Sequence, residues 1–447
     1  MFHTVNSAIS AFVWGPPMLA VFLGTGLYLS ARTGFYQIFG VGDWVGSTLL
    51  SAFKRRKKKT ASDGSISQLG ALTSALAACL GTGNIVGVAA ALCSGGAGSL
   101  FWMCISAVLG MMTCCCENIL GVKYRVKDSN GIFKGGPMYY IGHGLGMKGL
   151  AGAYAVLLTG ASLGMGNMTQ ANSVAQGLSG FSVPPLISGI IIAVLVAISV
   201  SGGLKRISAI SEKLIPVLSA AFVVACFIII GKNAANIVPC VKSVIKEAFT
   251  VKAVTGFGMS KAARYGISRG VFSNEAGLGS SAIIHAAADC ESPAEQGKWG
   301  ILEVFIDTVF MCTVTGAAIL TSGVWSPDTS LNGVELCTAV FESVFGRSGG
   351  YFLNACICLF AFATLVAWSY YGKSGAEYLF GEKSGRIYNM IYVAAAFAGS
   401  VIRFDSVWSI SDTLNGLMAV PNIFALLLLS KEAVGLLREE SHCLHRR

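Results

Sequence analysis

The chain has 447 residues, of which 54% are hydrophobic and only 12% are charged, and its mean hydropathy is +0.66. An average soluble domain carries about 25% charged residues, so this composition excludes an ordinary soluble protein and indicates one that crosses a membrane many times. The formal net charge of +10 does not point to nucleic acid, because the basic residues cluster at the ends of apolar segments, where they set topology and contact anionic lipids.

The N-terminal residues lack the positive region of a secretory signal, and a full-length apolar run follows them, so the first segment is expected to be retained. The chain has 14 cysteines. Three of them, Cys114, Cys115 and Cys116, are adjacent in one apolar segment, and none of the 14 has CxxC spacing. This pattern favours neither a disulfide framework nor a metal site.

A helix that spans a bilayer needs about 20 consecutive apolar residues. Windows of this length predict eleven spans, at residues 11–31, 69–92, 98–122, 150–177, 184–203, 213–231, 264–288, 300–323, 350–372, 387–402 and 414–430.

The densest positive run of the chain, residues 54–59, follows the first span, and the positive-inside rule places it in the cytoplasm. The N-terminus is then outside and the C-terminus is cytoplasmic. One connection, residues 231–264, disagrees, because it is placed outside although it carries five lysines. The apolar spacing of residues 241–249 within it predicts an amphipathic helix at the outer surface.

The second span is interrupted at its centre by the sequence Gly81-Thr82-Gly83-Asn84-Ile85-Val86-Gly87. Glycines, a hydroxyl and an amide stand where a lipid-facing helix favours leucine. Unpaired main-chain groups are costly in hydrocarbon, so irregular backbone is tolerated there only where it is buried in protein or lines a cavity. We therefore predict a functional break here, with the rest of the chain as its scaffold.

Without the first span, ten spans remain, and they divide into two sets of five with opposite orientation. The first span of the second set is also interrupted, by the polar and glycine-rich residues 268–281. Two such breaks in oppositely oriented halves are typical of secondary transporters with the leucine-transporter fold.

The expected parts are an N-terminal helix with a basic cytoplasmic loop (1–68), a first five-helix repeat (69–232), an extracellular amphipathic connection (233–263), an inverted second repeat (264–430) and a cytoplasmic tail (431–447).

A broken helix exposes N–H groups, which suit a carboxylate, at the start of one half, and C=O groups, which suit a cation, at the end of the other. Thr82, Gly83 and Asn84 offer such N–H groups, so a zwitterionic amino acid would be matched at both ends. The alternative is close helix packing through Gly83 and Gly87. Because a second interrupted helix is predicted opposite the first, we favour ligand binding over close helix packing as the role of these residues.

Two further spans carry candidate ligand groups. Residues 167–173 in the fourth span are rich in amides and hydroxyls, and Gln170 is the best candidate among them, although amides also join helices. In the ninth span, Thr364 and Trp368 lie one turn apart on one face. The Thr364 hydroxyl suits Na⁺ or an amine, whereas Trp368 by itself fits an interfacial aromatic belt better than a pocket.

Acidic residues within the spans are Glu117, Glu275, Glu303 and Asp307. Carboxylates inside a membrane are costly and are usually paired or functional. Arg269 is close to Glu275 in sequence, so we expect a structural ion pair that braces the second break. The other acids are interpreted as contacts between helices rather than as proton carriers.

Three motifs occur in order along the chain, LGTGNIVGVA at residues 80–89, GGPMYYI at 135–141 and RGVFSNEAGLG at 269–279. They resemble the alanine/glycine:cation symporter family, also called sodium:alanine symporters, over nearly the whole chain. The resemblance implies an all-α polytopic membrane protein with eleven helices, a leucine-transporter-like 5+5 inverted repeat and one extra N-terminal helix. It also implies uptake of alanine or glycine driven by Na⁺, or by H⁺ in some members.

The resemblance further implies a substrate pocket that includes Trp368, with the residues Thr82, Gly83, Asn84, Gln170, Val271, Phe272, Ser273, Thr364 and Trp368. A coupling Na⁺ would lie near Ala77, Leu80 and Thr364, although many relatives of the fold place two adjacent hydroxyls where this chain has Ala363 and Thr364. The expected partners are a small neutral amino acid (L-alanine, glycine or D-alanine), Na⁺ and the lipid bilayer. We expect a monomer in the plasma (inner) membrane, without a cofactor.

The leading hypothesis is thus a Na⁺-coupled importer that works by alternating access, and the alternative is an H⁺-coupled transporter of the same fold. A membrane enzyme is disfavoured because the five histidines are scattered, with no HExxH or GxSxG motif. A channel would expose repeated pore-lining rings, whereas this chain has two unlike breaks in one unit.

Overall fold

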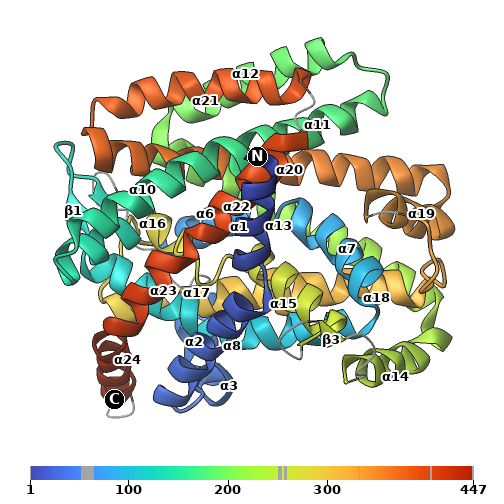
Figure 1. Ribbon diagram of the computed structural model, residues 1–447, viewed down its shortest axis with the longest axis horizontal. Helices are drawn as coiled ribbons and strands as arrows, with labels where there is room; N and C mark the ends of the chain where they lie inside the picture. Colours follow the sequence, from blue (N-terminus) through green and yellow to red (C-terminus); the bar gives the residue numbers. More distant parts are fainter. Residues whose placement is uncertain are drawn as a thin grey trace.

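Helices make up nearly all of the computed structural model (Figure 1). It describes residues 2–51, 65–249, 254–255, 259–331, 333–402 and 405–444, so the basic run at 54–59 lies outside the described residues. Two short antiparallel hairpins join helices: β1 (Val126–Lys127) pairs with β2 (Phe133–Lys134), and β3 (Val254–Thr255) pairs with β4 (Met259–Ser260).

The helices of the first half are α1 (Phe2–Val13), α2 (Pro16–Arg32), α3 (Tyr36–Phe39), α4 (Val41–Val45), η1 (Gly46–Leu50), α6 (Gln68–Cys79), η2 (Thr82–Asn84), α7 (Val86–Gly95), α8 (Gly98–Lys123), α9 (Pro137–Tyr139), η3 (Tyr140–Gly144), α10 (Lys148–Leu163), η4 (Gly164–Met168), α11 (Thr169–Ser179), α12 (Pro185–Ser201) and α13 (Gly203–Lys232).

Those of the second half are η5 (Ala234–Asn236), α14 (Ile237–Ala248), α15 (Lys261–Asn274), α16 (Ser281–His285), α17 (Pro293–Val304), η7 (Phe305–Cys312), α18 (Thr313–Thr321), α19 (Gly333–Phe345), α20 (Arg347–Phe380), α21 (Ser384–Val401), α22 (Asp405–Leu417), α23 (Ala419–Leu428) and α24 (Ser430–Leu444).

Seven helical segments among the described residues are long and apolar enough to cross a membrane: Thr4–Arg32, Gly98–Lys123, Lys148–Ser179, Gly203–Lys232, Pro293–Thr321, Arg347–Phe380 and Ser409–Leu428. Large apolar side chains on the outer faces of α12 and α13, such as Ile190, Ile198 and Val224, are exposed, as expected where lipid covers a helix. The chain is therefore a predominantly helical, multi-pass membrane protein. The number of eleven spans stays a prediction.

Several boundaries differ from the predicted ones. The first apolar segment begins at Thr4 instead of residue 11, because α1 and α2 follow each other with only Trp14 and Gly15 between them. Helix α19 was not predicted. Helix α14 confirms the helix expected around residues 241–249, and its apolar side chains Val238, Val241 and Ile245 are exposed.

The first predicted break is confirmed, and the second is shorter than predicted, because residues 268–274 of the expected break 268–281 are helical and only 275–280 are not. Helix α6 ends at Cys79, the single turn η2 follows, and α7 begins at Val86. Helix α15 ends at Asn274, and the backbone then turns through left-handed conformations at Glu275 (φ 56°), Gly277 (φ 97°) and Gly279 (φ 78°) before α16. Glycine adopts such conformations without a steric penalty, which explains the glycines of this loop.

The two broken helices lie side by side at the centre of the bundle. Helix α7 packs against α15, and α6 packs against α16. The second half of one broken helix therefore contacts the first half of the other, so the two run in opposite directions. Helix α8 packs along both α15 and α17 and holds the second break in place.

Candidate functional site

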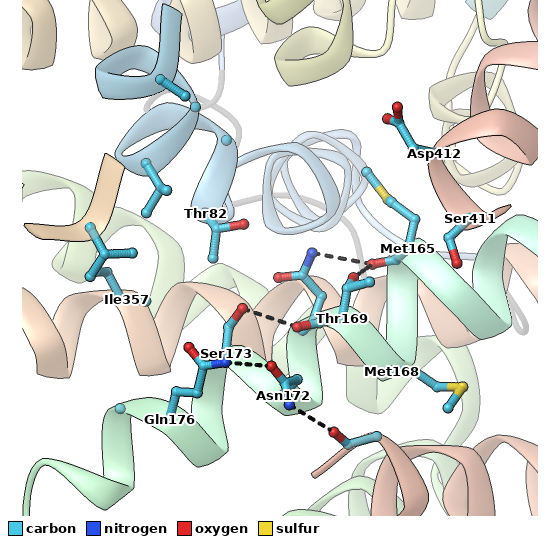
Figure 2. Close-up of a pocket in the computed structure, with 18 of the residues that line it drawn as sticks. Thr82, Met165, Met168, Thr169, Asn172, Ser173, Gln176, Ile357, Ser411 and Asp412 are labelled. Carbon is cyan, nitrogen blue, oxygen red and sulfur yellow. Dashed lines mark hydrogen bonds between the residues drawn. The ribbon is translucent and has the colours of Figure 1, made fainter. Parts of the chain in front are cut away.

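A cavity of about 1030 Å³ lies beside the first break (Figure 2). Its walls come from η2 and α7 on one side, from η4 and α11 on another, and from parts of α15, α20 and α22. Figure 2 shows Thr82 projecting toward the space bounded by Thr169 and Ser173 of α11, with Asp412 at another edge. The cavity therefore lies where the first break meets the rest of the bundle.

Four of the predicted site residues are brought together in the cavity wall: Thr82, Gly83, Gln170 and Phe272. The main-chain N–H groups of Thr82 and Gly83 have no hydrogen-bond acceptor within the described part of the chain. They lie just before α7, where the partial positive charge of a helix start favours an anion. This edge of the cavity can accept a carboxylate.

Gln170 offers the opposite kind of group. Its side chain is 5% exposed, and its Nε2 donates to the main-chain oxygen of Met165 at 3.2 Å. Its Oε1 is buried and accepts no hydrogen bond from the described residues. A buried acceptor without a donor is costly, and a ligand's ammonium group could supply that donor.

Asn84 and Ser273 do not reach the cavity and instead lie behind it, where the two breaks meet at Asp307. Asn84 Nδ2 donates to the main-chain oxygen of Asp307 at 2.9 Å and to its Oδ1 at 2.8 Å. Ser273 Oγ donates to Asp307 Oδ2 at 2.8 Å. Asp307 thus joins the first break to the second, as a contact between helices of the kind the sequence indicated.

Thr364 belongs to α20, and its side chain contacts the last turn of α6. Its Oγ1 donates to the main-chain oxygen of Ala77 at 3.0 Å. A Cβ placed on Gly81 would lie only 2.8 Å from the same Oγ1, so the break needs glycine at this position. The last carbonyls of a helix lack helical donors, and the end of α6 therefore carries oxygen atoms beside a hydroxyl, as a small cation would require.

Trp368 does not lie in an interfacial belt, because its side chain is completely buried. It packs on Gly166, where a Cβ would come within 2.5 Å of Trp368 Cβ, and edge-on against Tyr371. Neither Trp368 nor Val271 belongs to the cavity wall. Val271 is 4% exposed and packs with Trp14 and other apolar side chains around α2.

The ion pair expected between Arg269 and Glu275 is not formed within the described structure. Glu275 is buried and accepts a hydrogen bond from Ser280 Oγ, because the left-handed turn at Glu275 directs its carboxylate into the bundle. Arg269 lines the cavity instead, and its guanidinium lies 5.6 Å from the centre of the Phe272 ring.

Glu303 and Glu117 connect helices, as the sequence indicated. Glu303 Oε2 lies 3.0 Å from His285 Nε2 and accepts from Ser281 Oγ at 2.6 Å. Glu117 Oε1 accepts from the main-chain N–H of Gly277 at 3.0 Å and from Asn422 Nδ2 at 2.5 Å. These buried contacts tie the loop after α15 to α8, α17 and α23.

Asp412 is a cavity residue that the sequence reasoning missed. It belongs to α22 and faces the same cavity as Arg269, close enough for the two charges to interact. The predicted span begins at residue 414, whereas α22 already includes Asp412. An acidic residue only one turn before a long apolar helix was the available signal, since such residues are usually paired or functional.

Comparisons with known proteins show which family the chain resembles. A family model described as the sodium:alanine symporter family matches residues 1–445. The sodium/alanine symporter AgcS of Methanococcus maripaludis is 40% identical over 437 residues, covering 96% of this chain and 95% of the relative. The amino-acid carrier protein AlsT of Bacillus subtilis is 32% identical, with 97% and 90% covered. The probable sodium/glutamine symporter GlnT of B. subtilis is 33% identical, with 96% and 88% covered.

Solved transporter structures share the fold. MhsT in complex with L-phenylalanine matches with a TM-score of 0.54 at 13% identity, covering 84% of this chain and 99% of that one. Mhp1, a nucleobase-cation-symport-1 family transporter in a closed conformation with bromovinylhydantoin bound, matches with a TM-score of 0.50 at 14% identity, with 83% and 78% covered. At these identities the likeness concerns the fold alone.

Proposed function

The chain belongs to the sodium:alanine symporter family, and on that basis we propose that it takes up a small neutral amino acid, most favourably alanine or glycine, together with Na⁺. The observation that carries the proposal is that the first helix break, through Thr82 and Gly83, and the last turns of α15 before the second break, through Phe272, line one cavity. Such a meeting of broken helices supplies ligand groups inside a membrane protein without a metal centre or a catalytic nucleophile.

In this proposal the substrate binds between hydrogen-bond donors on one side and a hydrogen-bond acceptor on the other. Its carboxylate binds the free N–H groups of Thr82 and Gly83, and its ammonium donates to Gln170 Oε1. The side chains of Phe272 and Met165 cover the small apolar part of the molecule. The scheme requires only an ammonium group, a carboxylate and a small side chain, which L-alanine, glycine and D-alanine all have, and the name of the sodium/alanine relative supports alanine among them.

Na⁺ binds at the end of α6 in this proposal, near Ala77, Leu80 and Thr364. The Thr364 hydroxyl already lies 3.0 Å from the Ala77 carbonyl oxygen, so little rearrangement brings both to one ion. An ion at this place would stabilise the unwound first break and raise the affinity for the amino acid. By thermodynamic linkage, the amino acid must then raise the affinity for Na⁺ by the same factor.

The position of the cavity is compatible with transport by alternating access. Its wall includes Gly177 and Ser179 near the end of α11 and Asn354 near the start of α20. With the N-terminus outside and the C-terminus in the cytoplasm, these ends face outward. The opposite side is filled by the buried network of Glu117, Asn422 and Gly277. We therefore assign the structure to an outward-open state of a transporter in the plasma membrane.

The proposed architecture is two inverted repeats, residues 69–232 and 264–430, with residues 1–68 before them, an extracellular connection at 233–263 and a tail at 431–447. Helix packing supports it, because several first-repeat helices contact their counterparts: α8 packs on α17, α10 and α11 on α20, and α12 on α21. A two-fold axis between inverted repeats would produce this pairing.

Transport by purified protein in liposomes tests the proposal. Labelled alanine should accumulate under an inward Na⁺ gradient without a pH gradient, and competition by glycine and D-alanine should define the substrate range. Accumulation under a pH gradient alone, with none under a Na⁺ gradient, would support the H⁺-coupled alternative instead. Counterflow of alanine would distinguish carrier from channel behaviour.

A further inference from the structure

Arg269 and Asp412 are two opposite charges that share the cavity wall. Both side chains are partly exposed, both line the cavity, and they interact electrostatically. Neither forms an ion pair within 4.0 Å in the described part of the chain, so the guanidinium and the carboxylate are not in direct contact. The cavity therefore presents one cationic and one anionic group, and each is left to bind a further partner.

Two aromatic side chains hold these charged groups in position. The Arg269 guanidinium lies 5.6 Å from the centre of the Phe272 ring, and Phe272 packs edge-on against Trp14 with the ring centres 6.0 Å apart. Trp14 is buried, and its Nε1 donates to the main-chain oxygen of Asp412 at 3.2 Å. Because Trp14 joins α1 to α2, the first apolar segment ties α22 to α15. The two charges thus have defined positions, as a binding site requires.

The two charges lie on the outer side of the central site. In the proposed topology α15 and α22 both begin at the outer surface, Arg269 precedes Phe272 by one turn, and Asp412 belongs to the first part of α22. Figure 2 shows the Asp412 carboxylate directed from α22 toward the cavity, apart from Thr82. An amino acid that enters from outside therefore reaches these charges before it reaches Thr82 and Gly83.

The cavity has room for more than one small amino acid. Its volume is about 1030 Å³. Pockets that bind drug-sized ligands measure about 300–1,000 Å³, and alanine is much smaller than such a ligand. A molecule bound between the first break and Gln170 therefore leaves the space between Arg269 and Asp412 available.

We propose that Arg269 and Asp412 form an outer site that binds a second zwitterionic amino acid. The inference rests on the proposed function, since the outer site takes the same substrate as the central one. The guanidinium donates to the carboxylate of the amino acid, and the Asp412 carboxylate accepts from its ammonium group. Water weakens interactions between partly exposed charges, so the outer molecule binds less tightly than the central one. The outer site collects substrate at the mouth of the cavity and passes it to the central site.

The test is equilibrium binding of labelled alanine to the purified full-length chain in nanodiscs at saturating NaCl. The wild type should bind two molecules per chain, one of them weakly. Asp412→Asn and the double variant Arg269→Gln/Asp412→Asn should each bind one, and the double variant should hold it with nearly wild-type affinity. Arg264→Gln is the matched control, because Arg264 is also a partly exposed residue of α15 but does not belong to the cavity wall. This control should still bind two molecules.

One alanine per wild-type chain overturns the outer site, and so do two in the double variant. Alanine uptake under a Na⁺ gradient in these cases leaves the proposed function intact, whereas a wild type without such uptake contradicts that function. If the charge variants do not fold, Trp14→Phe keeps an aromatic ring and removes only the donor to Asp412. It should weaken the outer molecule and spare the central one, and an unchanged outer affinity overturns the proposal.

Discussion

Asn84 of the first break donates one amide group to both the main-chain oxygen and the carboxylate of Asp307, at 2.9 and 2.8 Å. The two residues are 223 positions apart in sequence. This contact fixes the short turn between α6 and α7 to η7, so that the N–H groups of Thr82 and Gly83 are left to face the cavity. The sequence singled out Asn84 as a ligand residue, and the structure gives its side chain a bracing role.

Asn84→Leu should abolish alanine binding and lower stability, because it removes two hydrogen bonds and leaves a buried carboxylate one donor short. Loss of a donor to a buried charged group costs about 1–3 kcal/mol or more. Thermal unfolding and alanine binding of the purified protein measure both effects. Asn233→Leu is the control, since Asn233 also donates to a main-chain oxygen but lies outside the cavity wall. Unchanged alanine affinity in Asn84→Leu would show that the break serves packing alone.

Gly166→Ala should impair alanine transport, because the added methyl group would displace the Trp368 side chain. A Cβ at this position would lie about 2.5 Å from Trp368, closer than carbon atoms approach, so the indole or η4 must move. We expect reduced alanine affinity and a destabilisation of about 1–3 kcal/mol. Gly152→Ala in α10 is the control, because nothing lies within 4 Å of its Cβ position. Equal uptake by both variants would argue against Trp368 as a support of the site.

Arg269→Gln should raise the KM for alanine more than it lowers the maximal rate. It leaves Asp412 unbalanced in the cavity wall, where a negative charge repels the substrate carboxylate. Arg269 is partly exposed, so stability should change by only about 0–1 kcal/mol. The double variant Arg269→Gln/Asp412→Asn should recover much of the affinity, and no recovery would indicate that the two charges act independently.

Thr364→Ala should shift the Na⁺ dependence of uptake to higher concentrations, with a smaller effect on the alanine KM at saturating Na⁺. Its hydroxyl lies at the proposed ion site beside Ala77. Thr159→Ala is the matched control, because its hydroxyl also donates to a carbonyl, that of Ala155, but within a single helix. A Na⁺ dependence identical in the two variants would place the ion elsewhere.

Replacing Na⁺ by choline should weaken alanine binding and lower the unfolding temperature. A ligand present at 100 times its Kd stabilises the folded state by about 2.7 kcal/mol, and that stabilisation disappears with the ion. Thermal unfolding of the purified protein in NaCl and in choline chloride, with and without alanine, measures it. Potassium chloride at the same ionic strength serves as a second control. Equal stability in all three salts would contradict Na⁺ binding.

The sequence by itself determined that the chain is a multi-pass helical membrane protein with two interrupted helices. Composition and apolar run length decide membrane insertion, and clustered glycines and polar residues favour a break in a membrane helix, so these features are local. The motifs also gave the family, and Thr82, Gly83, Gln170 and Phe272 do lie in one cavity.

The tertiary structure alone decided which partner each buried polar group has. Sequence proximity suggested that Arg269 pairs with Glu275, but the left-handed turn at Glu275 separates the two charges. Asn84, Ser273 and Asp307 come from three separate helices and meet only because the broken helices pack in opposite directions. Such contacts depend on how the helices pack in space, which cannot be predicted from the local pattern of residues.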